Sequence, residues 1–191
     1  HEIARYISNQ TLSDDFTSEG VESFIVGNTN GGARTVDVSS MAGVTTLGVS
    51  NTGDVVTFDE VADGTAISLS GDGAEDEGDT GADGATSGVA GVTANFDGNE
   101  AIASATVTIN NAGQELGVDD DDEERTLDVG DIDVDNVEAV TVDVSEGDAD
   151  INSLTAAAAT GLTITGTEDV TVQGTLGAAD TVESVNVDDV T

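Results

Sequence analysis

The chain has 191 residues and carries 40 Asp and Glu residues against 3 Arg and no Lys, which gives a formal net charge of −37 at pH 7. Such a polyanion is repelled by nucleic acids and by anionic membrane surfaces, so both are excluded as partners. Asp outnumbers Glu 26 to 14. Because hard cations take carboxylate oxygens as ligands, we expect the folded state to depend on cations, with Ca²⁺ as the cofactor.

The apolar residues are mostly small and β-branched. Hydrophobic residues make up 37% of the chain, with 4 Phe, 1 Tyr and no Trp, so that Val, Ala, Ile and Leu supply the core. This composition favours strands. Cys is absent, which excludes disulfides and thiolate chemistry. No apolar run reaches the roughly 18 residues of a membrane-spanning helix, so we expect no direct membrane insertion.

The chain begins with His1, and no basic segment precedes an apolar stretch. We interpret it as a processed mature protein or as a segment of a longer one. The best helical candidates are residues 2–8 and 153–160, each with one or two turns at most. From residue 21 onward, short apolar runs with a period of two alternate with turns rich in Gly, Asn and Asp. The predicted strands are residues 21–26, 34–38, 46–49, 55–58, 66–69, 105–109, 137–144, 162–165, 170–172 and 182–187.

Internal repeats connect these predicted strands. The pattern Val-Glu-x-x-x-Val occurs at residues 21–26, 137–142 and 182–187, and residues 44–56 parallel residues 161–172. The last two copies of the first pattern begin 45 residues apart, which fits two turns of a solenoid with rungs of 20-odd residues. We therefore predict an all-β fold, either a parallel β-solenoid or repeats of the β-sandwich type, with acidic calcium-binding loops.

Charge and glycine content divide the chain into four parts. Residues 1–20 form an N-terminal segment, and residues 21–112 form a first β repeat region with an acidic, Gly-rich insertion at 71–91. Residues 113–125 form an acidic loop or linker, and residues 126–191 form a second β repeat region. In the sandwich alternative the domain boundary lies at this linker. The simplest interpretation of both acidic stretches is a solvated insertion.

Three groups of acids are candidate metal ligands. The first lies in the stretch 71–79, which loosely resembles the Gly and Asp nonapeptides of calcium β-rolls but lacks their Gly-Gly-x-Gly-x-Asp spacing. The second lies in the acidic run 119–124, where Ca²⁺ would relieve the repulsion between adjacent carboxylates. The candidate ligands of these two groups are Asp72, Asp76, Asp79, Asp119, Asp120, Asp121, Asp122 and Glu123.

The third group is Asp131, Asp133 and Asp135, which alternate with Ile132 and Val134 as the residues of a strand do. The three carboxylates should lie on one face, roughly 7 Å apart. At that distance each neighbouring pair repels by about 0.6 kcal/mol in water. Two interpretations are open: a plain solvated strand face, or a carboxylate ladder that shares Ca²⁺ with a neighbouring rung or subunit.

Residues suited to catalysis are scarce. The single His is His1, Cys and Lys are absent, and no Gly-x-Ser-x-Gly elbow or phosphate-binding loop occurs. Paired carboxylates can hydrolyse glycosidic bonds, but sugar-binding sites use aromatic platforms that this chain almost lacks. We therefore expect that the protein is not an enzyme.

Several phrases of the sequence resemble a known class of proteins. Val-Glu-Ser/Ala-x-x-Val, Leu-Thr-Ile-Thr-Gly-Thr-Glu-Asp-Val-Thr-Val and Ala-Asp-Thr-Val-Glu-Ser-Val-Asn-Val are similar to the repeats of prokaryotic S-layer proteins and related RTX-type surface proteins. The resemblance covers residues 21–58 and 137–191. It implies a secreted, calcium-dependent protein at the cell surface that self-assembles as a homo-oligomer into a lattice or filament, with a cell-surface glycan as anchor and no catalytic residues.

Two alternatives keep the same fold class. Extreme acidity without Lys also suits a halophilic surface that holds hydrated cations in concentrated salt. Calcium sites need tight clusters of carboxylates, whereas halophilic acids spread over every exposed strand face, and the sequence contains both patterns. An adhesin module of a larger surface protein is the other alternative, and it would need an exposed binding surface that the sequence does not identify.

Overall fold

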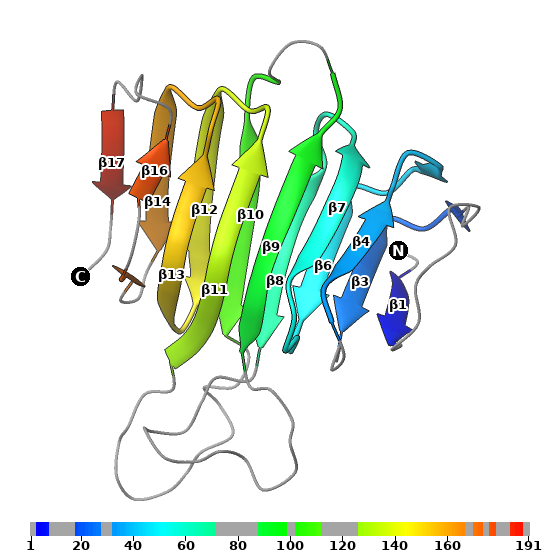
Figure 1. Cartoon of the computed structure of the whole chain (residues 1–191), viewed down its shortest axis with the longest axis horizontal. Coiled ribbons are helices and arrows are strands. Elements are labelled where there is room, and N and C mark those ends of the chain that lie inside the picture. Colours follow the sequence, from blue (N-terminus) through cyan, green and yellow to red (C-terminus); the bar gives the residue numbers. More distant parts are fainter. Residues whose placement is uncertain are drawn as a thin grey trace, which may run out of the picture.

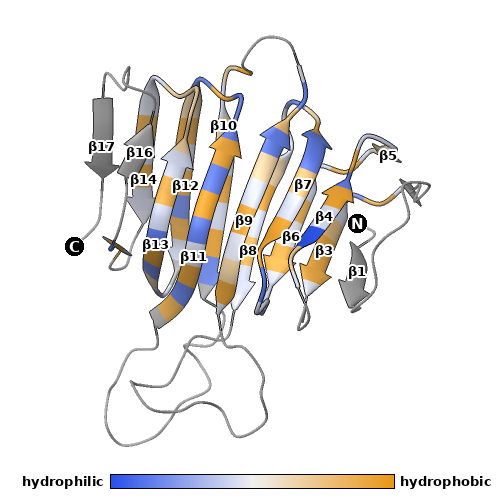
Figure 2. Ribbon diagram, viewed as in Figure 1, coloured by the Kyte–Doolittle hydropathy of each residue, from blue (hydrophilic) through white to orange (hydrophobic). Residues whose placement is uncertain are grey.

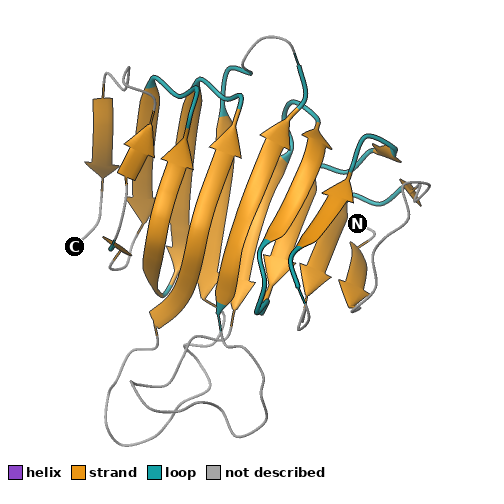
Figure 3. Ribbon diagram, in the orientation of Figure 1, coloured by secondary structure: helices purple, strands orange, loops and turns teal. Residues whose placement is uncertain are grey.

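The computed structural model describes residues 3–7, 18–27, 32–71, 88–98, 102–111, 126–166, 170–173, 176–178 and 184–188. These residues contain strands, turns and loops, as Figure 3 shows, and no helix that could cross a membrane is found among them. The all-β prediction is confirmed. Both helical candidates were wrong: Ile3–Ile7 is a strand, and residues 153–156 end another. Pairing with a neighbouring strand gives these backbones hydrogen bonds that one or two isolated helical turns cannot maintain.

The strands form two large sheets in which every described pairing is parallel. Sheet 1 contains β1 (Ile3–Ile7), β3 (Ser23–Gly27), β6 (Thr46–Ser50), β8 (Ala66–Gly71), β10 (Ala105–Asn111), β12 (Ala139–Glu146), β14 (Gly161–Gly166) and β17 (Ser184–Asp188). Sheet 2 contains β4 (Arg34–Asp37), β7 (Val56–Val61), β9 (Val89–Phe96), β11 (Thr126–Asp135), β13 (Asp148–Ala156), β15 (Val170–Val172) and β16 (Leu176–Ala178). The short strands β2 (Ser18–Glu19) and β5 (Met41–Ala42) pair with each other.

From β6 to β15, successive strands alternate between the two sheets, and each strand pairs with the strand of its own sheet in the next turn of the chain; β15 and β16 both pair with β13 in sheet 2. We call one such turn, a sheet 1 strand followed by a sheet 2 strand, a rung. Ser23 pairs with Thr46, and Thr46 pairs with Ala66, so each of these rungs is roughly 20 residues long. Figure 1 shows the two sheets as layers whose strands run in opposite directions.

Two rungs are longer because long connections join their sheet 1 strand to their sheet 2 strand. Ile67 pairs with Val107, and residues 72–88 stand between β8 and β9. Val107 in turn pairs with Val142, and residues 112–125 stand between β10 and β11. At the two ends of the predicted insertion 71–91, Gly71 ends β8 and residues 89–91 open β9. The strand reaches this far because Val89 is buried in the core.

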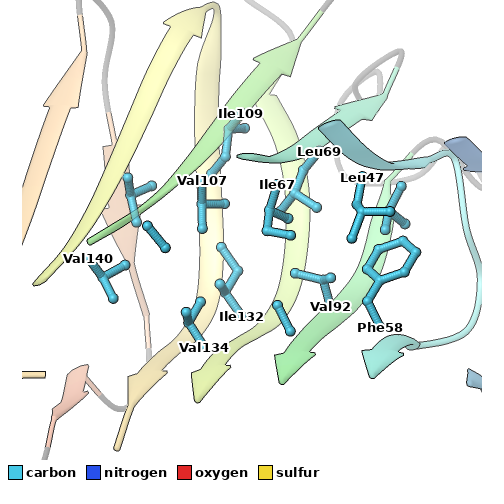
Figure 4. Close-up of a cluster of buried hydrophobic side chains, with 14 of the residues drawn as sticks. Leu47, Phe58, Ile67, Leu69, Val92, Val107, Ile109, Ile132, Val134 and Val140 are labelled. Atoms are coloured by element: carbon cyan, nitrogen blue, oxygen red, sulfur yellow. The ribbon is translucent and has the colours of Figure 1, made fainter. Parts of the chain in front are cut away.

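The core lies between the sheets and is built from inward side chains of both (Figure 4). Along sheet 1, one inward side chain of each rung stands in register with the next: Phe24, Leu47, Ile67, Val107, Val142 and Ile164. A facing row in sheet 2 contains Val56, Val92, Ile132 and Leu154. A single hydrophobic cluster extends from Phe24 to Ile164. Both sheets and this cluster continue from one side of residues 113–125 to the other.

At one level of sheet 2, two consecutive residues of a strand face outward, so the alternation of inward and outward side chains shifts by one residue. We call this level the offset line. In β11 the neighbours Gly130 and Asp131 both face outward, and in β13 the same holds for Asn152 and Ser153. Gly130 cannot carry a side chain, because an added Cβ would collide with the carbonyl oxygen of Ala90 in β9. The close approach of these two backbones therefore requires glycine at this position.

Candidate cation-binding face

The outer side of sheet 2 and its adjoining turns carry a large set of carboxylates, which we call the acidic face. Its described members are Asp37, Asp59, Glu60, Asp97, Asp128, Asp131, Asp133, Asp135, Asp148 and Asp150. The inward neighbours of the strand residues in this set are buried, so the strand alternation directs the acids outward. In Figure 2 hydrophilic bands alternate with hydrophobic ones along β11.

The structure places Asp131, Asp133 and Asp135 on β11, with Ile132 and Val134 between them fully buried. Asp131 is exposed, and the other two are half-buried. Their partners on the adjacent strands are not carboxylates. The residues paired with these three acids are Gly91, Ser153, Thr93, Thr155 and Asn95. A ladder of carboxylates therefore runs along β11, while each step to a neighbouring strand meets an uncharged residue.

Hydrogen bonds satisfy Asp131. The amide Nδ2 of Asn152 donates to its Oδ1 at 2.7 Å, and the hydroxyl of Ser153 donates to the same atom at 2.6 Å. The Ser153 bond, followed by the Asn152 bond, lowers the pKa of Asp131 below its usual value. Asp131 is thus held ionised by protein donors.

The pKa values of Asp133 and Asp128 are shifted in the opposite direction to that of Asp131. Partial burial raises the pKa of Asp133, and the charges of Asp135 and Asp131 raise it further. Partial burial also raises the pKa of Asp128, with a contribution from Asp150, its register partner on β13. The Nε2 of Gln173 donates to Oδ2 of Asp150 at 2.6 Å. At both positions the folded chain disfavours the ionised form unless a cation approaches.

A second row of acids crosses the strands of sheet 2, and alternation within single strands does not predict it. Asp37 pairs with Asp59, Asp59 with Asn95, and Asn95 with Asp135. The amide Nδ2 of Asn95 donates to Oδ1 of Asp59 at 2.6 Å, so one carboxylate of the row has a hydrogen-bond donor beside it. Asp37 and Asp59 lie one rung apart in the sequence, so an alignment at the rung length would have revealed this pair.

Glu60 stands beside this row in a left-handed backbone conformation, with φ of 60°. The charge of Asp97 raises the pKa of Glu60 most, and a hydrogen bond with the Asp97 side chain, some burial, and the charges of Asp37 and Asp59 raise it further. Within the described residues no group of three or more Asp, Glu, His or Cys could hold a metal ion. The candidates Asp72, Asp76, Asp79, Asp119, Asp120, Asp121, Asp122 and Glu123 lie outside the described residues.

The outer side of sheet 1 differs from the acidic face in charge. Its outward side chains on β3 to β14 are small and mostly hydroxylated, and we call this surface the hydroxyl face. The described side chains are Ser23, Ile25, Thr46, Ala66, Ser68, Ser70, Thr106, Thr108, Asn110, Ala139, Thr141, Asp143, Ser145, Thr163 and Thr165. Among these described positions only Asp143 carries a charge, and the hydroxyl of Thr165 donates to its Oδ1 at 3.1 Å.

Comparison of the chain with protein-family models, with curated proteins and with solved structures gave no match.

Proposed function

We propose that this chain is a structural protein of the cell surface, built as a parallel β-solenoid whose folded state is stabilised by cations, with Ca²⁺ as the first candidate. It would form part of an extracellular self-assembling layer or filament and catalyse no reaction. The alternation of strands between two parallel sheets, with rungs of roughly 20 residues where no insertion intervenes, supports the solenoid.

The observation that carries the cation dependence is the acidic face. Adjacent parallel strands lie about 4.8 Å apart, so the carboxylates of Asp37 and Asp59, or of Asp128 and Asp150, are near neighbours. Two unit charges at such a distance repel by about 1 kcal/mol in water and by several kcal/mol near a partly buried surface. A bound cation would turn this repulsion into attraction.

The register suggests how Ca²⁺ would be held. Paired carboxylates such as Asp128 and Asp150 would supply two ligand groups, and the remaining oxygens of the six to eight that Ca²⁺ prefers would come from water and neighbouring hydroxyls or carbonyls. Such bridges across strands would also stabilise the stacking of one rung on the next. Cations bound in this way would exchange readily and would be removed by a chelator.

A titration tests the proposal. The chain in low salt is monitored by circular dichroism and light scattering while CaCl₂ is added, with MgCl₂ at equal ionic strength as the control. We expect strand signal and assembly to appear at millimolar Ca²⁺ and to disappear when chelator is added. Folding and assembly in low salt that are indifferent to both cations and chelator would contradict the proposal.

A halophilic surface is the second candidate function. The acids of the acidic face are spread over β4, β7, β11 and β13 and the turn after β9, and no group of three among the described residues could hold a metal, a distribution suited to solvation. This candidate predicts that molar NaCl or KCl restores folding as well as Ca²⁺ does. A response confined to molar monovalent salt would favour it over calcium bridging.

A further inference from the structure

We infer that the hydroxyl face is the surface through which two copies of this chain associate, face to face. The inference deepens the proposed function, because it rests on self-assembly and assigns that assembly to one side of the molecule. It differs from association through metal-bridged acids, which would use the acidic face.

Charge separates the two outer faces as binding surfaces. Ten described carboxylates lie on the acidic face, so two copies that met there would bring like charges together at a cost of several kcal/mol without cations. The described side chains of the hydroxyl face include one carboxylate, Asp143, which already accepts a hydrogen bond from Thr165. Of the two outer strand faces, the described part of the hydroxyl face is therefore the one on which a second copy meets less repulsion, with Glu22 and Glu138 placed in the turns that lead into β3 and β12.

The chemistry of the hydroxyl face suits a flat, self-complementary contact. Thr and Ser hydroxyls both donate and accept hydrogen bonds, so identical surfaces can pair. The register places hydroxyls in rows across the strands. One row contains Ser23, Thr46, Thr106, Thr141 and Thr163, with Ala66 between Thr46 and Thr106, and a second contains Ser68, Thr108, Asp143 and Thr165. Neighbouring positions along a row are one strand spacing of about 4.8 Å apart, so the rows of two copies share the same period, although Ala66 interrupts the hydroxyls of the first row and Asp143 those of the second.

Small residues keep this surface level. Gly48 leaves room for its neighbour, since an added Cβ would lie 2.9 Å from Cγ1 of Ile25. Ile25 therefore lies over Gly48 and supplies an aliphatic contact among the hydroxyls. A contact between two identical faces is isologous and is satisfied by a two-fold axis.

The size of the hydroxyl face sets the expected strength. Six strands at about 4.8 Å spacing, with about five residues of about 3.3 Å each, give roughly 500 Å² per copy. The total of roughly 1,000 Å² lies at the lower limit of specific interfaces. We therefore expect a reversible association whose extent depends on protein concentration.

The experiment compares matched substitutions on the two faces. Thr108→Asp and Thr163→Asp place a carboxylate on the hydroxyl face, and Thr57→Asp and Thr93→Asp do the same at half-buried, outward positions of sheet 2. Sedimentation velocity over a range of protein concentrations, in Ca²⁺ at which circular dichroism shows the fold, gives the dissociation constant. We expect the hydroxyl-face variants to weaken association at least tenfold and the sheet 2 variants to change it less than about twofold.

Two further variants keep the test decisive. Asp143→Asn removes the described carboxylate of the hydroxyl face and should tighten association. If the Asp variants do not fold, Thr108→Tyr and Thr93→Tyr replace them, because Tyr favours strands but its ring holds two flat faces apart. Weakening by Thr108→Tyr with Thr93→Tyr unaffected supports the inference.

The inference is overturned if the hydroxyl-face variants associate as tightly as the wild type, or if both sets weaken association equally. A wild-type chain that is folded in Ca²⁺ but monomeric at every concentration overturns it too, while it leaves cation stabilisation intact. Failure of the proposed cation dependence has a separate signature, namely folding in low salt that chelator does not change, and the comparison between faces can still be made in that case.

Discussion

At the scale of single residues, neighbouring carboxylates of one strand respond to the fold in opposite ways. Burial and the charges of Asp135 and Asp131 raise the pKa of Asp133, whereas hydrogen bonds from Ser153 and Asn152 lower the pKa of Asp131. A raised pKa means that ionisation of Asp133 destabilises the folded state above that pKa, and that this penalty vanishes below the unfolded value of about 3.9. A lowered pKa means that ionised Asp131 stabilises the fold, and that this contribution is lost as the pH falls through its folded pKa.

We therefore expect Asp133→Asn to raise the unfolding temperature at pH 7 by about 1–3 °C and to lose this advantage as the pH falls below about 4. Asp131→Asn is the control of opposite sign: it should lower the unfolding temperature at pH 7 by a small amount, because Asp131 is exposed and solvent screens its charge. Thermal unfolding followed by circular dichroism at several pH values checks both. Equal shifts of the same sign would show that net charge alone governs stability.

At the scale of the strand, the offset line of sheet 2 depends on a glycine. Gly130→Ala would place a methyl group against the carbonyl oxygen of Ala90, and the backbone would have to move. We expect a loss of about 1–3 kcal/mol in the free energy of unfolding. Gly161→Ala is the control, since no atom lies within 4 Å of an added Cβ there, and it should be close to neutral. Denaturant titration in Ca²⁺ measures both, and a neutral Gly130→Ala would contradict the close packing of β9 on β11.

Regular alternation made some strands predictable, and its interruption hid others. The predicted strand 162–165 lies within β14, where Leu162 and Ile164 face the core and the residues between them face outward. In β13 the two adjacent outward residues Asn152 and Ser153 break the period of two, and the Ala run that follows suggested a helix. The helix propensity of the Ala run is a local property of the sequence. It takes no account of the pairing between β13 and β11, which holds this segment extended.

The sequence predicts which acids of one strand share a face, but it does not predict which acids of neighbouring strands lie side by side. The positions of Asp131, Asp133 and Asp135 follow from alternation alone, whereas the pairs Asp37 with Asp59 and Asp128 with Asp150 depend on the register between rungs. The members of each pair are one rung apart in the sequence. The clearest sequence repeat is two rungs long, so it does not reveal the length of one rung or which acids pair. The hydroxyl face was missed for a related reason, because its Thr and Ser residues are ordinary in a strand and become a surface only when the strands are stacked.

At the scale of the whole molecule, one core connects the rungs on both sides of residues 113–125. We expect Phe58→Ala on one side and Val142→Ala on the other to shift the same, single unfolding transition, since both side chains are fully buried in this cluster. The expected losses are about 3–5 kcal/mol for Phe58→Ala and about 1–3 kcal/mol for Val142→Ala. Fluorescence of a bound dye and circular dichroism should report coincident transitions, and two separate transitions would indicate independent domains.

The connections from sheet 1 to sheet 2 differ greatly in length, although the strands that they join end at the same edge of the stack. Residues 72–88 join β8 to β9, residues 112–125 join β10 to β11, and Gly147 alone joins β12 to β13. The strands on either side keep their register regardless, and a longer connection adds little entropic cost to a fold that is already paired. Descendants of one such gene can therefore gain or lose segments at this edge and diversify what they display there, while both faces keep the spacing on which stacking depends.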